Sequence, residues 1–150
     1  MKIRNATQKD RSEYLSMAHA FYHSNAVCHP IPDVHLERTF DEALSNNPFL
    51  RVIILEFDDN VAGFAHLSFT WSTEAGGMVV LIEDLYIKPA FRGKGLGSFF
   101  FNAIFDEYEP LACRYRLEVS ESNKRAKKLY ESLGFEDLNY GQMIRETPKL

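Results

Sequence analysis

A glycine-rich turn, Arg92-Gly93-Lys94-Gly95-Leu96-Gly97, is the segment of this chain whose residue types most clearly suit chemistry. It follows an apolar, strand-like run from Met78 to Ile87 and precedes an aromatic helical run from Ser98. Glycines at alternate positions let the backbone curl around a ligand and point N–H groups at it, and the helix adds the positive end of its dipole. The turn therefore predicts a cradle for an anion, and the expected ligand carries phosphate.

The spacing of the turn excludes two common phosphate motifs. The dinucleotide pattern G-x-G-x-x-G needs glycine where Ser98 stands, and the P-loop pattern G-x-x-x-x-G-K-[ST] does not fit either. The pattern that fits is [QR]-x-x-G-x-[GA], with Arg92, Gly95 and Gly97 in the specified places. For the loop alone, the alternative is a turn that merely lets a strand pack on a helix.

Two carboxylates stand in the apolar run ahead of the turn, at Glu83 and Asp84. A protonated amine must lose its proton before it can act as a nucleophile, and a carboxylate beside a cleft can accept that proton. Adjacent residues in a regular strand point to opposite faces, so only one of the two can face a cleft unless the strand bulges there. Either residue is a candidate base or proton relay, and a solvated or structural role for both is the alternative.

A second pair of functional side chains stands further along the chain, at Asn123 and Tyr130. Seven positions on a helix bring two residues within about 20° of one face and roughly 10 Å apart along the axis. An amide and a phenol then line one groove. Alternatively, Tyr130 is a tyrosine at the edge of the core beside Leu129 and Leu133.

Both segments resemble signatures of the GNAT family of N-acetyltransferases. The turn is similar to the coenzyme A pyrophosphate loop of that family, and the segment from Asn123 to Phe135 is similar to its N-x-x-A-x-x-x-Y-x-x-x-G-F signature. The resemblance implies that acetyl-CoA is the cosubstrate, that Asn123 touches the pantetheine arm, and that Tyr130 protonates the thiolate. It gives Leu85 and Ile87 main-chain contacts to the acetyl group and pantetheine. The residues expected to bind the coenzyme are Leu85, Tyr86, Ile87, Arg92, Gly93, Lys94, Gly95, Leu96, Gly97, Ser98, Asn123, Ala126 and Tyr130.

The resemblance also sets the expected acceptor. Members that acetylate histones carry their base two residues before Glu83, where this chain has Leu81, whereas an acidic pair before the loop resembles members that acetylate polyamines and other small amines. We therefore expect direct transfer to a primary amine of a polyamine-like or amino-acid-like molecule in a ternary complex. The alternatives are a protein or peptide amino terminus or lysine as acceptor, and a sensor module that binds acyl-CoA without chemistry. The residues expected to contact the acceptor are Phe21, Tyr22, His23, Glu83 and Asp84.

The elements that must position these residues predict an α/β (α+β) fold with a mixed sheet. Hairpins in the middle of the chain give antiparallel pairs, and the crossover through the helix from Ser98 makes its flanking strands parallel. We expect the GNAT fold, with six to seven strands, about four helices, and parallel strands splayed around the coenzyme site. Strands are predicted at Lys2–Ala6, Arg51–Phe57, Val61–Trp71, Met78–Ile87, Tyr115–Val119 and Tyr140–Arg145. The first helix is predicted to begin at a capping box formed by Thr7 and Asp10 and to run to Ser24. The other helices are predicted at Asp33–Ser45, Ser98–Tyr108 and Asn123–Leu133.

Composition bounds the class of protein. A chain of 150 residues with 45% hydrophobic content suits one domain over residues 1–150. The net charge of −4 argues against a nucleic-acid partner, and the absence of a run of about eighteen apolar residues argues against a membrane span. We expect a cytoplasmic protein, and the family resemblance suggests a homodimer.

No metal is expected. His19 and His23 stand one helical turn apart, but helix faces and loop hydrogen bonds are their ordinary explanation. Cys28 and Cys113 show no C-x-x-C spacing, so we expect buried free thiols rather than a disulfide or zinc site, and we expect Trp71 in the core.

Overall fold

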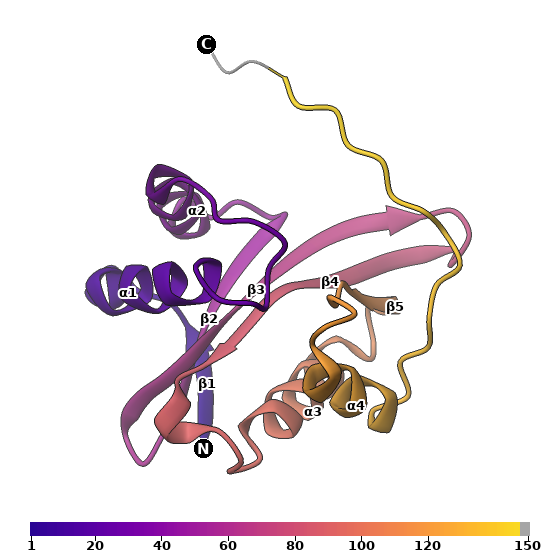
Figure 1. The fold of residues 1–150 in the computed structure, drawn as a ribbon. Coiled ribbons are helices and arrows are strands. Elements are labelled where there is room, and N and C mark those ends of the chain that lie inside the picture. The colour runs from indigo at the N-terminus through magenta and orange to yellow at the C-terminus, as the bar shows by residue number, and fades with distance from the viewer. Residues whose placement is uncertain (148–150) are drawn as a thin grey trace.

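A computed structural model describes residues 1–147 and shows a five-stranded sheet with helices on both faces (Figure 1). The strands are β1 (Lys2–Asn5), β2 (Leu50–Phe57), β3 (Asn60–Ser72), β4 (Gly77–Ile87) and β5 (Ala112–Leu117). The helices are α1 (Arg11–Tyr22), α2 (Asp33–Leu44), α3 (Leu96–Tyr108) and α4 (Lys124–Ser132), with short 3-10 turns η1 (Gln8–Asp10) and η2 (Pro89–Phe91).

The sheet is mixed, as the sequence predicts. Its spatial order is β1-β2-β3-β4-β5, so each strand pairs with its neighbour in sequence. The first four strands are antiparallel, and β4 pairs with β5 in parallel across the connection through α3. The fold class and the parallel pair at the predicted place are therefore confirmed.

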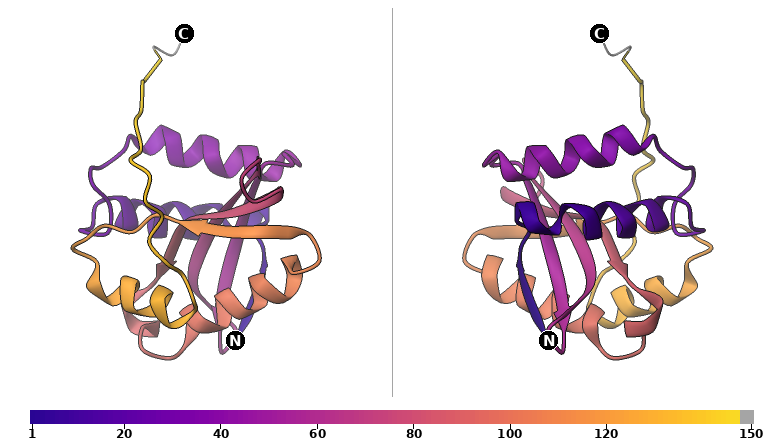
Figure 2. Two further views of the ribbon diagram at one scale, coloured as in Figure 1. Left: turned by 90° about the vertical axis from the view of Figure 1, so that its right-hand side faces the viewer. Right: turned by 90° about the vertical axis from the view of Figure 1, so that its left-hand side faces the viewer.

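Both faces of the sheet are buried, because α1 and α2 cover one face and α3 and α4 the other (Figures 1 and 2). Side chains of β2 alternate accordingly: Ile53 and Leu55 pack toward α3, whereas Val52 and Ile54 pack toward α1 and α2. Burial on both faces explains why the strands read as continuous apolar runs instead of alternating ones.

The predicted strand count is too high, because the last predicted strand does not form. Residues 135 to 147 contain no helix or strand, and the segment extends away from the body (Figure 1). Phe135 at its start packs against the core, but the later apolar side chains cover no apolar face, since Met143 is 98% and Ile144 81% exposed. The only side-chain hydrogen bonds that this segment makes within residues 1–147 to the sheet and its flanking loops are Tyr140 to Glu74 and Gln142 to Glu118. The segment does not pair with the free edge of β5, so strand propensity alone is insufficient to order a strand here.

Three burial predictions are also wrong. Trp71 is 73% exposed because it lies at the far end of β3, beside the turn into β4 and beyond the part of the sheet that the helices cover. Cys28 lies in the exposed loop between α1 and α2, and Cys113 lies on β5, which pairs on one side only. All three residues occupy margins of the fold, where residue type alone does not decide burial. No helix within residues 1–147 is long and apolar enough to span a membrane.

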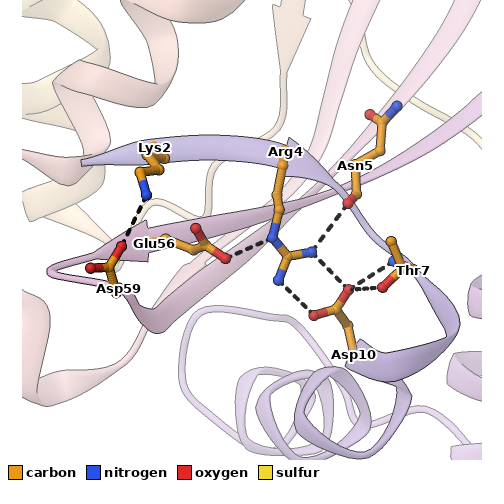
Figure 3. A network of polar contacts seen from close by, with 7 residues as sticks. All are labelled: Lys2, Arg4, Asn5, Thr7, Asp10, Glu56 and Asp59. Carbon is orange, nitrogen blue, oxygen red and sulfur yellow. Dashed lines mark hydrogen bonds and ion pairs between the residues drawn. The ribbon is translucent and has the colours of Figure 1, made fainter.

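An ion-pair network fixes the first strand to the start of the first helix (Figure 3). Both terminal nitrogens of the Arg4 guanidinium donate to the Asp10 carboxylate at 2.8 Å, and its Nε donates to Glu56 at 2.6 Å. Asp10 also accepts the backbone N–H and the hydroxyl of Thr7 at 2.8 Å, so the predicted capping box opens η1. The Arg4 hydrogen bonds, with those from Thr7, lower the pKa of the buried Asp10 carboxyl to about 2.

This network makes the stability of the fold pH-dependent. Because the pKa of Asp10 is lower in the folded chain than its usual value of 3.8, its contribution is complete above pH 4 and is lost as the pH falls toward 2. We expect Asp10→Asn to lower the free energy of unfolding at pH 7 by about 2 kcal/mol, and the deficit to shrink at pH 2.5. Urea denaturation at both pH values measures the difference.

Asp59→Asn is the matched control. Asp59 also pairs with a cation of β1, Lys2, but both side chains are exposed, so we expect no measurable change in stability (Figure 3). An Asp10→Asn deficit of the same size at pH 7 and pH 2.5 would contradict the assignment.

Candidate active site

The parallel strands β4 and β5 separate to open a cleft. Their pairing runs from Met78–Ala112 to Ile82–Leu117, where β5 ends, while β4 continues unpaired on that side to Ile87. A cleft of about 720 Å³ occupies this opening. Its walls are residues 82–87 of β4, the loop from Phe91 to Ser98 apart from Lys94, the segment after β5, one face of α4, Phe21 of α1, and residues 24–26 after that helix.

The glycine loop forms one wall of the cleft and leads into α3. Gly93 and Gly95 adopt left-handed backbone conformations, with φ of 76° and 83°, and α3 begins at Leu96. The first N–H groups of a helix have no partner within the helix, so they are available to an anion at this end of the cleft. The loop is held by Arg92, whose Nε donates to the carbonyl of Ile87 at 2.8 Å. This arrangement fits the phosphates of a nucleotide coenzyme.

Two loop residues have contacts that the sequence does not reveal. The Lys94 ammonium lies over the rings of Phe57 and Phe91, at 4.9 and 5.4 Å from their centroids, and does not line the cleft. At Gly97, an added Cβ would stand 2.9 Å from Leu129 Cδ2, so glycine permits close packing of α3 against α4. The loop thus contacts β4 through Arg92 and α4 through Gly97 at the wall of the cleft proposed to bind the coenzyme.

A β-bulge in β4 lies at Glu83. Against β3, His66 pairs with Asp84 and Leu67 with Ile82, so Glu83 is an extra residue without a direct partner. Before the bulge, Val80 and Ile82 pack toward α3, whereas after it Tyr86 packs toward α1 and α2. The bulge therefore transfers the even-numbered residues of β4 to the other face.

The bulge brings both carboxylates to the cleft in different environments. Glu83 is exposed and accepts a hydrogen bond from the Ser68 hydroxyl at 2.6 Å. Asp84 is only 7% exposed, and its Oδ2 accepts the Tyr22 hydroxyl at 2.7 Å and contacts His66 Nδ1 at 2.5 Å. Within residues 1–147, neither carboxylate forms an ion pair with lysine or arginine.

The second wall carries the side chains predicted on α4. Asn123 is the N-cap of α4, and its Oδ1 accepts the backbone N–H of Ala126 at 3.2 Å. Tyr130 lies on the same helix face, lines the cleft, and packs edge-on against Phe101 with ring centroids 5.5 Å apart. Burial raises the pKa of the Tyr130 phenol, so the hydroxyl is protonated at neutral pH.

Three residues at the end of α1 were predicted to contact the acceptor amine, and the structure separates them. Phe21 lines the cleft, and Tyr22 reaches it through the hydrogen bond to Asp84. His23 is exposed outside the cleft lining, where its ring stacks on His19 with centroids 4.0 Å apart. Within residues 1–147, no group of three or more His, Cys, Asp or Glu side chains is placed to hold a metal ion.

Sequence reasoning missed His66, which joins Asp84 to a buried tyrosine. His66 is buried on β3, and its Nε2 lies 2.8 Å from the hydroxyl of Tyr14 on α1. The available signal was a lone ionisable residue in the apolar run Ala62–Leu67, in the strand paired with the acidic pair.

Comparisons with known proteins identify the family and the fold. The Acetyltransferase (GNAT) family model matches residues 14–135. Thialysine N-epsilon-acetyltransferase of Mus musculus is 27% identical over 146 residues, covering 91% of this chain and 85% of that protein. The fold is similar to a "possible acetyltransferase" from Clostridium difficile 630, with a TM-score of 0.84, 21% identity and coverage of 99% and 98% of the two chains. It is also similar to an aminoglycoside N-acetyltransferase in complex with CoA, with a TM-score of 0.78, 19% identity and coverage of 97% and 93%.

The chain thus has the acetyltransferase fold, with a coenzyme-sized cleft between its parallel strands. It belongs to the GNAT family and is an acetyl-CoA-dependent N-acetyltransferase.

We propose that the loop conformation is required for coenzyme binding. Gly95→Ala places a side chain at φ 83°, which costs about 1 kcal/mol, and relaxation of the strain would turn N–H groups away from the phosphates. We expect a higher Kd for coenzyme A, measured by isothermal titration calorimetry, together with a small loss of stability.

Gly76→Ala is the control for backbone strain. Gly76 lies in the turn between β3 and β4 with φ 72°, and an added Cβ meets no atom within 4 Å. The same backbone cost should therefore leave the Kd for coenzyme A unchanged. If both variants weaken coenzyme binding equally, the effect is global, and the loop is not the cradle.

Proposed function

We propose that this acetyltransferase transfers the acetyl group directly to a primary amine of a small molecule, polyamine-like or amino-acid-like, in a ternary complex. The observation that carries the proposal is the pair of carboxylates at the bulge, neither of which forms an ion pair with lysine or arginine in residues 1–147. A cleft with such acidic groups attracts an alkylammonium and can accept its proton. The thialysine acetyltransferase relative, named for a small amine substrate, adds support.

The cleft residues have proposed roles on the coenzyme side. Acetyl-CoA supplies an acetyl group as a thioester whose carbonyl carbon an amine can attack. The helix N-terminus at Leu96 and the loop N–H groups would hold the diphosphate, and the side of β4 that β5 leaves unpaired would hold the pantetheine arm through Leu85 and Ile87. Asn123 lies on the opposite wall, where it would contact the same arm.

On the acceptor side, Asp84 and Glu83 are the proposed proton acceptors. The amine loses its proton to one of them, directly or through water, as the carbon–nitrogen bond forms and the carbon–sulfur bond breaks. Tyr130 is the proposed acid, because its protonated phenol lines the same cleft and can donate to the departing thiolate. Neither cysteine lines the cleft, which supports attack by the amine itself over a covalent enzyme intermediate.

A panel of acceptors tests the proposed substrate class. Thiol release from acetyl-CoA is measured with polyamines, thialysine and other amino acids, aminoglycosides, and peptides with a free amino terminus or lysine. We expect turnover with small amines and little with peptides. Turnover with peptides alone would favour a protein acetyltransferase, and coenzyme binding without turnover on any acceptor would favour a sensor module.

Tyr130→Phe tests the proposed acid. Loss of the hydroxyl should lower kcat by about 10²-fold, because general acid catalysis of thiolate departure is lost. The Kd for coenzyme A should not change, since the ring keeps its packing against Phe101. Tyr115→Phe is the matched control, because Tyr115 is a half-buried tyrosine outside the cleft. Wild-type kcat in Tyr130→Phe would remove Tyr130 from the mechanism.

Homodimer formation and a cytoplasmic location stay predictions. The extended segment after α4 exposes Leu138, Tyr140, Met143 and Ile144, which is apolar surface that a second copy of the chain could cover.

A further inference from the structure

A buried polar chain runs from the core of the fold to the cleft. It starts at Tyr14, which is fully buried on α1, passes through His66 on β3, and ends at Asp84 on β4. Within residues 1–147, every buried polar side-chain atom has a hydrogen-bond partner, so the chain is fully satisfied. A buried polar network of this kind holds its members in one geometry.

The hydrogen bonds specify which nitrogen of His66 carries the proton. An ionised Asp84 can only accept, so His66 Nδ1, at 2.5 Å from Oδ2, must donate. Burial and the negative charge of Asp84 raise the pKa values of both Tyr14 and Tyr22, so both phenols remain donors. The Tyr14 hydroxyl has no other hydrogen-bond partner within residues 1–147, so it donates to Nε2 of His66, and the ring proton lies on Nδ1.

The same bonds leave one oxygen of Asp84 free for the cleft. Oδ2 accepts from both His66 and Tyr22, whereas Oδ1 has no hydrogen-bond partner within residues 1–147. Because no buried polar side-chain atom there lacks a partner, Oδ1 must reach solvent, and Asp84 lines the cleft. The network therefore turns a nearly buried carboxylate so that a single oxygen faces the acceptor.

We propose that His66 is a positioning residue of the acetyl transfer: held by Tyr14, it fixes Asp84 with Oδ1 toward the cleft, where that oxygen receives the N–H of the acceptor amine. The inference rests on the proposed function, since it requires an amine acceptor. Tyr22 supports the same orientation from α1, and the bulge at Glu83 brings Asp84 opposite His66.

Two amide substitutions separate the contacts of His66. The amide nitrogen of asparagine can occupy the place of Nδ1, so His66→Asn keeps a donor to Asp84 and gives up the contact with Tyr14. The longer His66→Gln places its amide near Nε2, which keeps the contact with Tyr14 and gives up the donor to Asp84. Both variants bury an uncharged polar side chain, so they are matched for the general cost of the substitution.

We expect His66→Gln to lower kcat by about 10²-fold with the small amine used best by the wild type, because a displaced carboxylate loses its orientation. We expect His66→Asn to stay within about threefold of the wild type, because it loses one neutral hydrogen bond. The Kd for coenzyme A should be unchanged in both, and the melting temperatures should be similar. Equal kcat values in the two variants, or wild-type kcat in His66→Gln, would overturn the proposal.

Nitrogen NMR of the ¹⁵N-labelled wild-type protein tests the tautomer without any variant that must fold. At pH 7.5 we expect the His66 ring to carry its proton on Nδ1, with the resonances assigned by their absence from His66→Gln or, if that variant does not fold, through ring couplings. A ring with its proton on Nε2 and none on Nδ1 would overturn the proposal. Because this readout needs no acceptor, it is independent of the proposed function, which the acceptor panel tests.

Discussion

The one-residue bulge at Glu83 is the constraint on which the candidate site depends. The pairing of β4 with both of its neighbours changes at this point. On one side β5 stops pairing after Ile82, and on the other side His66 of β3 pairs with Asp84, where a regular strand would present Glu83. A regular β4 would carry Asp84 on the face that packs against α3. The bulge instead places it among the polar groups of α1 and β3, at the mouth of the opening between the parallel strands.

The two faces of the sheet contribute different halves of the site. The α3 and α4 side supplies the glycine loop proposed to bind the diphosphate, together with the amide of Asn123 and the phenol of Tyr130. The α1 side supplies aromatic rings and the hydrogen bonds that fix Asp84. In the proposed mechanism the acceptor and the coenzyme would meet at β4, which, like β2 and β3, packs against both groups of helices.

Local patterns identified most of the loop and α4 residues that line the cleft, because these residues lie close together in sequence. The loop from Arg92 to Gly97 and the α4 face of Asn123 and Tyr130 depend on turn chemistry and helix periodicity. The acceptor wall depends on pairing across strands, so His66 could be found only from the register of β3 against β4. The predictions that Trp71 is buried and that Tyr140–Arg145 forms a strand were wrong for a related reason, since both depend on what covers the margins of the sheet.

The cleft draws its walls from residues as far apart in the sequence as Phe21 and Tyr130. During synthesis on the ribosome, the antiparallel strands can pair as soon as β4 has emerged, because each strand has its neighbour beside it in sequence. The coenzyme pocket is complete only after α4 has followed. A nascent chain therefore gains no stabilisation from the coenzyme until nearly all of the fold exists. Coenzyme binding stabilises complete molecules and not partial ones.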